Sequence, residues 1–311
     1  MLDVLAVTVP VFLVIGAGYA AARAGLLDAG QVDALMTFTQ RFAIPALLFL
    51  AIARLDLREG FDLRLLGAYY SGSLLAFAAG VAGAILWLGR GREDAVAVGF
   101  AAMFSNTVLL GLPISERAYG ADSLAPNFAI IALHAAFCYL VGIGAMEAAR
   151  GGGEGPGLGA KLAGVARRLG SNGLMIGVAL GLAVNLSGLP LPGPVDEAVT
   201  LVSRAALPAA LFALGGVLTR YRPEGDVRGI ALVCGVSLMV HPAWTFGMGR
   251  LLDLEIGPLR AAVVTAAMAP GVNAYLFAAA EGRALRISAS SVLIGTALCT
   301  LTVPVWLLVL G

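Results

Sequence analysis

Two short polar segments interrupt long apolar stretches of this chain, and each combines proline, glycine and asparagine. In the first segment, Ser105, Asn106 and Thr107 precede Gly111 and Pro113. Proline donates no backbone hydrogen bond and its ring clashes with the preceding helical turn, so it opens a helix at that point. We therefore expect an interrupted helix here, with polar side chains beside the opened backbone.

The second polar segment is Pro270-Gly271, with Asn273 close behind it. The N-terminus of each resumed half-helix carries partial positive charge and unpaired amide N–H groups. Two such ends facing one centre favour an anion, above all a carboxylate, to which Asn106 and Asn273 could donate further hydrogen bonds. The alternative is that these prolines merely kink packed helices, with the asparagines bonded to neighbouring backbone. Because the two segments form a matched pair, we favour a binding site.

Two arginines also lie within apolar segments. Arg41 is four residues before Pro45, and Arg204 is four residues before Pro208. A charged side chain at the centre of a membrane helix costs about 2.5–3.5 kcal/mol on insertion scales. Its repetition suggests a use, such as drawing an anion inward, and we count Arg41 among the candidate substrate-binding residues. The alternative is that each side chain snorkels to the nearer interface.

The two histidines of the chain, His134 and His241, lie in apolar stretches as well. Imidazole titrates near neutral pH, so either residue could carry a proton coupled to another event. The alternative is a hydrogen-bonded packing role.

The elements that position these residues must lie in a membrane. The chain is 59% hydrophobic and 13% charged, whereas a soluble domain has about 25% charged residues. Gly177 and Gly181 form a small-xxx-small pair of the kind that lets membrane helices approach closely. Stretches of roughly 20 apolar residues predict ten spans, at 4–22, 34–53, 65–89, 95–116, 123–147, 172–190, 198–219, 229–250, 259–280 and 287–310.

The two halves of the chain resemble each other. Residues 41–55 read RFAIPALLFLAIARL and residues 204–218 read RAALPAALFALGGVL, at a constant offset of 163. Ala101-Ala102-Met103 in the fourth predicted span likewise corresponds to Ala266-Ala267-Met268 in the ninth. Interrupted helices at matching positions of inverted repeats are the best sequence indication of a transport site.

We therefore predict an all-α membrane protein built as a five-plus-five inverted repeat. The first repeat covers residues 1–147, and the second covers residues 172–311. A glycine-rich, basic linker joins them at residues 148–171. More lysines and arginines fall on the linker side of the membrane than on the other, so we expect a cytoplasmic linker and both termini outside.

Other classes of function find little support in the sequence. The net charge of +1 gives no indication of nucleic acid. Cys138, Cys234 and Cys299 lie in apolar runs and are expected to fill the core, so we predict no metal site and no cofactor. The chain has no HExxH or GxSxG motif and no paired carboxylates placed for acid–base work, so we do not expect an enzyme.

The segment SNTVLLGLPISERAYG, residues 105–120, resembles the signature of the auxin efflux carrier family, part of the bile acid, auxin and arsenite transporter superfamily. RFAIPALLF and APGVNAYLFAAAEG are similar to the second and ninth helices of that family. The resemblance implies ten helices with the fourth and ninth crossing at their breaks. It also implies a homodimer, a scaffold of helices one, two, six and seven, and a moving domain formed by the others. Ala274 stands where the plant pattern has a second proline, which favours a small polar acid over the plant hormone.

From these patterns we expect a bacterial inner-membrane carrier of small organic anions that works by elevator-type alternating access. The substrate carboxylate would bind where the fourth and ninth helices cross. One alternative is a sodium-coupled symporter of the bile-acid type. Another is a membrane receptor that binds an organic acid without transporting it.

Overall fold

The computed structural model describes residues 2–54, 62–151, 159, 164, 173–224 and 226–311. These residues are helical and contain no strand, apart from one isolated antiparallel bridge between Ser105 and Pro270. They gather into two compact units. The first unit comprises Met1–Thr8, Leu63–Val165 and Tyr221–Gly311, and the second comprises Val9–Asp62 and Ala166–Arg220.

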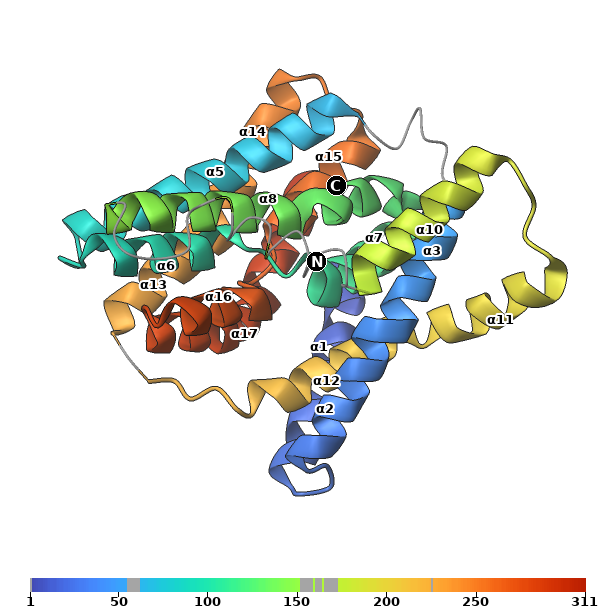
Figure 1. Cartoon of the computed structure of the whole chain (residues 1–311), viewed down its shortest axis with the longest axis horizontal. Helices are drawn as coiled ribbons and strands as arrows, with labels where there is room; N and C mark the ends of the chain where they lie inside the picture. The colour runs from blue at the N-terminus through green and yellow to red at the C-terminus, as the bar shows by residue number, and fades with distance from the viewer. Residues whose placement is uncertain (1, 55–61, 152–158, 160–163, 165–172, 225) are drawn as a thin grey trace. The chain divides into compact units, whose positions relative to one another are not determined.

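The first unit contains most of the helices. They are α5 (Leu63–Leu86), α6 (Arg92–Met103), η2 (Thr107–Gly111), α7 (Leu112–Tyr119), η3 (Ala121–Leu124), α8 (Ala125–Arg150), α13 (Val227–Gly235), η4 (Val236–Val240), α14 (His241–Leu251), α15 (Ile256–Ala266), α16 (Val272–Glu281) and α17 (Leu285–Leu310). In Figure 1, α5, α6 and α8 run alongside one another, and α6 packs against both of the other two. The close approach of α5 to α6 requires glycine, because a Cβ on Gly80 would collide with the Cα of Gly99.

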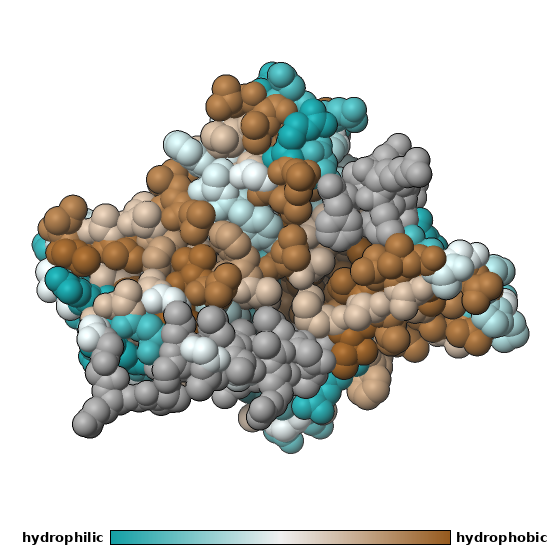
Figure 2. Space-filling model, turned by 45° about the horizontal axis from the view of Figure 1, so that its top comes forward, coloured by the Kyte–Doolittle hydropathy of each residue, from teal (hydrophilic) through white to brown (hydrophobic). Residues whose placement is uncertain are grey.

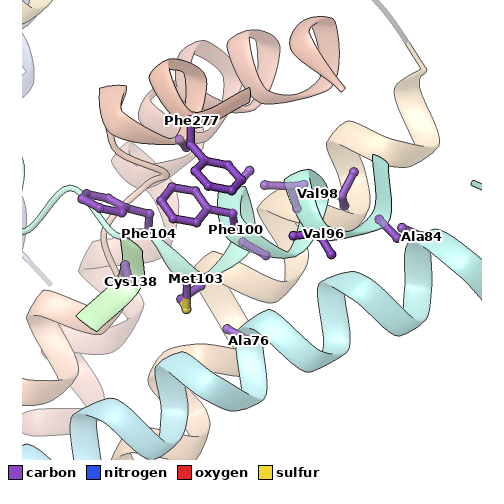
Figure 3. Packing of buried hydrophobic residues seen from close by; sticks show 14 of the residues in the cluster. Ala76, Ala84, Val96, Val98, Phe100, Met103, Phe104, Cys138 and Phe277 are labelled. Carbon is purple, nitrogen blue, oxygen red and sulfur yellow. The ribbon is translucent and has the colours of Figure 1, made fainter. Parts of the chain in front are cut away.

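Aromatic side chains fill the core of the first unit. Phe100 and Phe277 stack with their ring centroids 3.9 Å apart, and Phe104 lies 5.5 Å from Phe100 (Figure 3). All three are buried, together with Met103 and Cys138. This cluster lies at the C-terminal end of α6, next to the point at which that helix ends.

The second unit contains α1 (Leu2–Arg23), α2 (Ala29–Phe38), η1 (Thr39–Ala43), α3 (Ile44–Ala53), α10 (Gly173–Ser187), α11 (Gly193–Arg204) and α12 (Ala206–Leu218), with the first residues of α1 assigned to the other unit. Gly181 of α10 lies against the backbone oxygen of Phe49 in α3, and Gly18 of α1 lies against the backbone oxygen of Phe212 in α12. Both the two glycines and the two phenylalanines are 163 residues apart. The same close contact therefore occurs at equivalent positions of the two halves.

Three wide π-helical turns occur in the described residues, and each ends two residues before a proline. η1 precedes Pro45, η2 precedes Pro113 and η4 precedes Pro242. The amide after each wide turn donates to a carbonyl five residues back, as Leu112 does to Thr107. A wide turn accommodates the proline ring, which cannot fit a regular turn.

Seven described helical runs are long and apolar enough to cross a membrane, with mean hydropathy between 1.5 and 2.2. Many large apolar side chains on them are exposed, among them Leu13, Leu86, Leu201 and Leu301. Figure 2 shows broad hydrophobic areas on the visible face, with hydrophilic residues in patches near its margins. Such a surface requires lipid as its solvent, so the chain is a multi-pass membrane protein.

Three of the ten predicted spans are not among these seven runs. The spans 95–116 and 259–280 are each interrupted, because α6 ends at Met103 and α15 ends at Ala266. The span 172–190 corresponds to α10, which has 15 residues in the part of the chain that is described. The count of ten spans and the inverted repeat therefore stay predictions. The linker predicted at 148–171 lies largely outside the described residues, and α8 continues to Arg150.

Ion pairs gather where several helices of the first unit end. Arg150, the last residue of α8, pairs with Glu281 at the end of α16 at 2.7 Å. Arg283 pairs with Glu93 at 2.9 Å. Arg90 pairs with Asp226 at 3.1 Å. Desolvation raises the pKa of the Asp226 carboxyl, but the hydrogen bonds from Arg90 and from backbone N–H groups together outweigh it, so the pKa is lowered. Charges placed together in this way mark an end of the unit that meets water.

Candidate functional site

The two predicted helix breaks lie against each other within the first unit. After α6 the chain leaves the helix at Phe104, and after α15 it resumes only at Val272. The Asn106 N–H donates to the Ala269 carbonyl at 2.8 Å, and the Gly271 N–H donates to the Phe104 carbonyl at 2.8 Å. These two bonds flank the bridge between Ser105 and Pro270 and hold the opened segments side by side.

The pairing of the breaks follows the sequence repeat. Ala101 and Ala266, which correspond in the two halves, are 165 residues apart. The bridged residues Ser105 and Pro270 are also 165 residues apart. So are the two donors, Asn106 and Gly271, and the two acceptors, Phe104 and Ala269. Each half of the chain therefore supplies one donor and one acceptor, and they come from corresponding positions of the repeat.

Neighbouring helices hold both breaks in place. A Cβ added to Gly111 in η2 would lie 3.6 Å from the carbonyl oxygen of Asn106 and 3.6 Å from the Met268 side chain. On the other side, the Ala269 N–H donates to the Cys299 sulfur of α17 at 3.1 Å, and Gly295 of α17 allows close approach to Pro270. The open backbone is therefore satisfied by protein, as an interruption in a membrane helix requires.

Asn106 has one end of its amide occupied and the other end free. Its Oδ1 accepts the Leu109 N–H at 3.2 Å and so caps the helical segment that follows. Its Nδ2 is buried and has no hydrogen-bond partner among the described residues. The whole residue is only 5% exposed. A buried amide donor without a partner costs roughly 1–3 kcal/mol, so a ligand acceptor at this point is favoured.

Asn273 also accepts a hydrogen bond through its amide oxygen, but from a side chain of another helix. It lies in the first turn of α16, and its Oδ1 accepts the Tyr139 hydroxyl of α8 at 3.4 Å. Gly271, which precedes this helix, makes no side-chain cap. The first turn of α16 is partly satisfied by the backbone, because the Ala274 N–H donates to the Gly271 carbonyl at 2.9 Å. Both asparagines use their oxygen within the protein, which suits an anion and not a cation.

The other polar residues predicted at the first break are also buried. Ser105 and Thr107 are 0% and 4% exposed, and Pro113 lies within the first two positions of α7. Ser105 Oγ lies 3.3 Å from Nδ1 of His241. His134 approaches the same region, because its Nδ1 lies 3.4 Å from the Tyr69 hydroxyl. The structure thus brings both histidines to the first break.

Arg41 and Arg204 belong to the second unit, and both are exposed. Arg41 lies in η1, and Arg204 is the last residue of α11. A role for Arg41 in substrate binding stays a prediction. No group of three or more histidine, cysteine, aspartate or glutamate side chains able to hold a metal occurs in the described residues.

Sequence reasoning missed three polar residues near the breaks: Tyr69, Asn127 and Tyr139. Asn127 Nδ2 donates to Ser115 at 3.1 Å and to Thr265 at 2.8 Å, which links α8 to α7 and α15. Each of the three residues is a polar side chain inside an apolar run, and that signal was available in the sequence. Their partners are more than ten residues away in the chain, so the sequence did not show what they contact.

A helical membrane protein whose two interrupted helices are paired at their breaks has the architecture of a membrane transporter. The membrane transport protein family matches residues 3–155 and 161–307, and the chain belongs to this family, which confirms the resemblance to the auxin efflux carriers. The chain is also similar to a protein of Rhizobium meliloti (strain 1021) named "Putative malonate transporter". The two sequences are 26% identical over 314 residues, which cover 97% of this chain and 94% of that protein.

Proposed function

We propose that this transporter carries small organic anions and that the substrate carboxylate binds at the paired helix breaks. The observation that carries the proposal is the buried, unpartnered Nδ2 of Asn106. Its direction is fixed because Oδ1 is engaged by the Leu109 N–H. A preorganised donor of this kind, beside the uncapped N-terminus of α16, is suited to a carboxylate oxygen.

The polarity of the surroundings supports the proposed substrate class. The polar groups at the breaks are small and uncharged: the two asparagine amides, the Ser105 and Thr107 hydroxyls and the Tyr139 hydroxyl, next to the rings of Phe104 and Phe277. Such surroundings favour a small acid that is held by hydrogen bonds. The similar protein of R. meliloti is named for malonate, a compact dicarboxylate, and malonate is therefore the first probe.

We further propose a ten-helix inverted repeat with crossing fourth and ninth helices. The two hydrogen bonds between corresponding positions at the breaks and the matched glycine contacts of α1 and α10 support it. In this proposal the second unit is the scaffold and the first unit moves against it to expose the site to each side in turn. The resemblance adds a homodimer in the inner membrane of a bacterium, with a cytoplasmic linker and both termini outside.

The test is malonate binding and malonate flux with the wild type and Asn106→Asp. Aspartate keeps an acceptor for the Leu109 N–H, so the cap survives, but it replaces the free donor by a negative charge. We expect malonate to raise the unfolding temperature of the purified wild type and to have no effect on Asn106→Asp.

The matched control is Asn185→Asp, which makes the same exchange in the second unit, where Asn185 donates to the Ile52 and Ala53 carbonyls. Malonate should still stabilise this variant. Equal stabilisation of wild type and Asn106→Asp would refute the site. Binding without flux in proteoliposomes would indicate a receptor, and flux that requires sodium would indicate a bile-acid-type symporter.

A further inference from the structure

A closed cluster of buried polar side chains lies beside the first break and shares only Ser105 with the proposed carboxylate site. It consists of Tyr69 from α5, Ser105 from the break, His134 from α8 and His241 from α14. Ser105 Oγ is 3.3 Å from His241 Nδ1, and the Tyr69 hydroxyl is 3.4 Å from His134 Nδ1. None of the four residues is more than 2% exposed.

Tyr69 packs against both imidazoles. Its ring centroid is 5.7 Å from that of His134 and 5.3 Å from that of His241. Nε2 of His241 is buried and has no hydrogen-bond partner among the described residues. The two histidines, 107 positions apart in the sequence, therefore share one enclosed environment with one vacant nitrogen.

Among the residues that the structure describes, the groups found to contact the histidines carry no fixed charge. From α5 they meet Tyr69, and Tyr70 stacks edge-on against Tyr69 and donates its hydroxyl to the Ile130 carbonyl. From α8 the Cys138 sulfur lies 3.7 Å from His134 Nδ1, and from the break the Phe104 ring lies 4.7 Å from the His134 ring. The remaining titratable neighbours are thus two tyrosines and a thiol. Neither histidine forms an ion pair with a carboxylate within the described part of the chain.

We propose that His134 and His241 form one proton-binding site whose counter-ion is the bound substrate anion, so that anion and proton are carried together. This inference rests on the proposed carboxylate site. A buried cation without a nearby negative charge is strongly disfavoured, and two adjacent cations even more so. An anion at Asn106, the residue next to Ser105, supplies the missing negative charge, so the proton and the anion each favour the binding of the other.

The proton step needs no other reactant. A proton from the solution adds to an imidazole nitrogen while the anion binds, and it returns to solution when the anion leaves. In this proposal Tyr69 is a positioning residue, because its hydroxyl lies 3.4 Å from Nδ1 of His134 and its ring packs against both imidazoles. Binding of the proton together with the anion neutralises one negative charge of the substrate before the site moves through the membrane.

The experiment is calorimetric titration of purified protein with malonate in buffers that differ in ionisation enthalpy, near pH 7. The dependence of the heat on the buffer measures the protons taken up. For the wild type we expect an uptake of about one proton per malonate bound. His134→Gln and His241→Gln keep hydrogen-bonding groups but cannot titrate, so each should bind malonate with the uptake lost.

Thr245→Val is the matched control, because Thr245 is buried one turn beyond His241 and its hydroxyl has no partner among the described residues. Its proton uptake should equal that of the wild type. As a second measurement, an inward proton gradient should accelerate malonate entry into proteoliposomes for the wild type and for Thr245→Val, but not for the glutamine variants.

Malonate binding by the wild type without proton uptake would overturn this inference and leave the proposed function intact. Uptake that persists in both glutamine variants would also overturn it, because malonate itself would then carry the proton. Failure of the wild type to bind any small carboxylate would overturn the proposed function, on which the inference depends. If a glutamine variant does not fold, the buffer dependence of the heat for the wild type still shows whether malonate binding takes up a proton.

Discussion

The two helix breaks reach the same backbone geometry by different side-chain arrangements. At the first break, Asn106 caps its own helical segment, and a wide turn then accommodates Pro113. At the second break, Pro270 lies in the bridge itself, and Asn273 is held from another helix by Tyr139. The donor of the first break is therefore fixed by local contacts, whereas the donor of the second depends on the position of α8.

This difference predicts that the two asparagines respond differently to substitution, with the largest effect at Asn106. Asn106→Ala removes both the cap and the free donor, so it should be about 1 kcal/mol less stable than Asn106→Ser, which also lacks the amide donor but can still cap. It should also weaken malonate binding by about 1.5–3 kcal/mol, or tenfold and more. Asn106→Ser retains a capping acceptor and should lose affinity without losing stability. Urea unfolding and malonate titration of both variants separate the two roles.

Asn273→Ala supplies the reference for that experiment, because Asn273 caps no helix. It should lower malonate affinity and leave the free energy of unfolding nearly unchanged. A loss of stability as large as that of Asn106→Ala would remove the distinction between the breaks.

Gly295→Ala should disturb the second break alone. The added Cβ would lie 2.8 Å from the Cδ of Pro270, so α17 or the break must shift. Overpacking of this kind costs about 1–3 kcal/mol of stability. Gly235→Ala is the matched control, since no described atom beyond its chain neighbours and the nearby backbone of its own helix lies within 4 Å of the position of its Cβ. Thermal unfolding that ranks the two variants equally would contradict the close packing of α17 on Pro270.

Tyr139→Phe should have the smallest effect. It removes the hydroxyl that holds Asn273 Oδ1 and keeps the ring that packs 5.4 Å from Phe100. We expect malonate affinity to fall by about 1 kcal/mol or less, a few-fold, because the amide of Asn273 is then free to turn. Combined with Asn273→Ala, the substitution should add nothing further. An additive loss in the double variant would show that Tyr139 acts elsewhere.

Local signals account for what the sequence predicted about the site. Pro270 lies in the second break, which could therefore be placed from the sequence. The first break lies at residues 104–106, and the polar residues there indicated it. Pro113 does not open the helix, because the wide turn of η2 accommodates its ring within the helical segment that follows. The pairing of Ser105 with Pro270 is a contact over 165 residues, and no local pattern reports it. The partners Tyr69 and Tyr139 were missed for the same reason.

Hydropathy alone was also insufficient for counting the membrane spans. The predicted span 95–116 is apolar throughout its first part, yet α6 has 12 residues because the chain leaves the helix at Phe104. A hydropathy window detects apolar residues and does not detect a change of backbone direction. The helix breaks that exclude the spans 95–116 and 259–280 from the long apolar helices are the same breaks that form the candidate site.

The matched contacts of Gly18 and Gly181 have a consequence for how this protein can evolve. At both positions any side chain would strike a backbone oxygen of the facing helix, and a backbone oxygen cannot rotate away. Leu13 and Leu180, on the same two helices, are 65% and 56% exposed and can exchange for any residue that lipid accepts. Among relatives, we expect the outer face of each helix to vary freely. We expect glycine to be retained at the positions of Gly18 and Gly181, independently in each half.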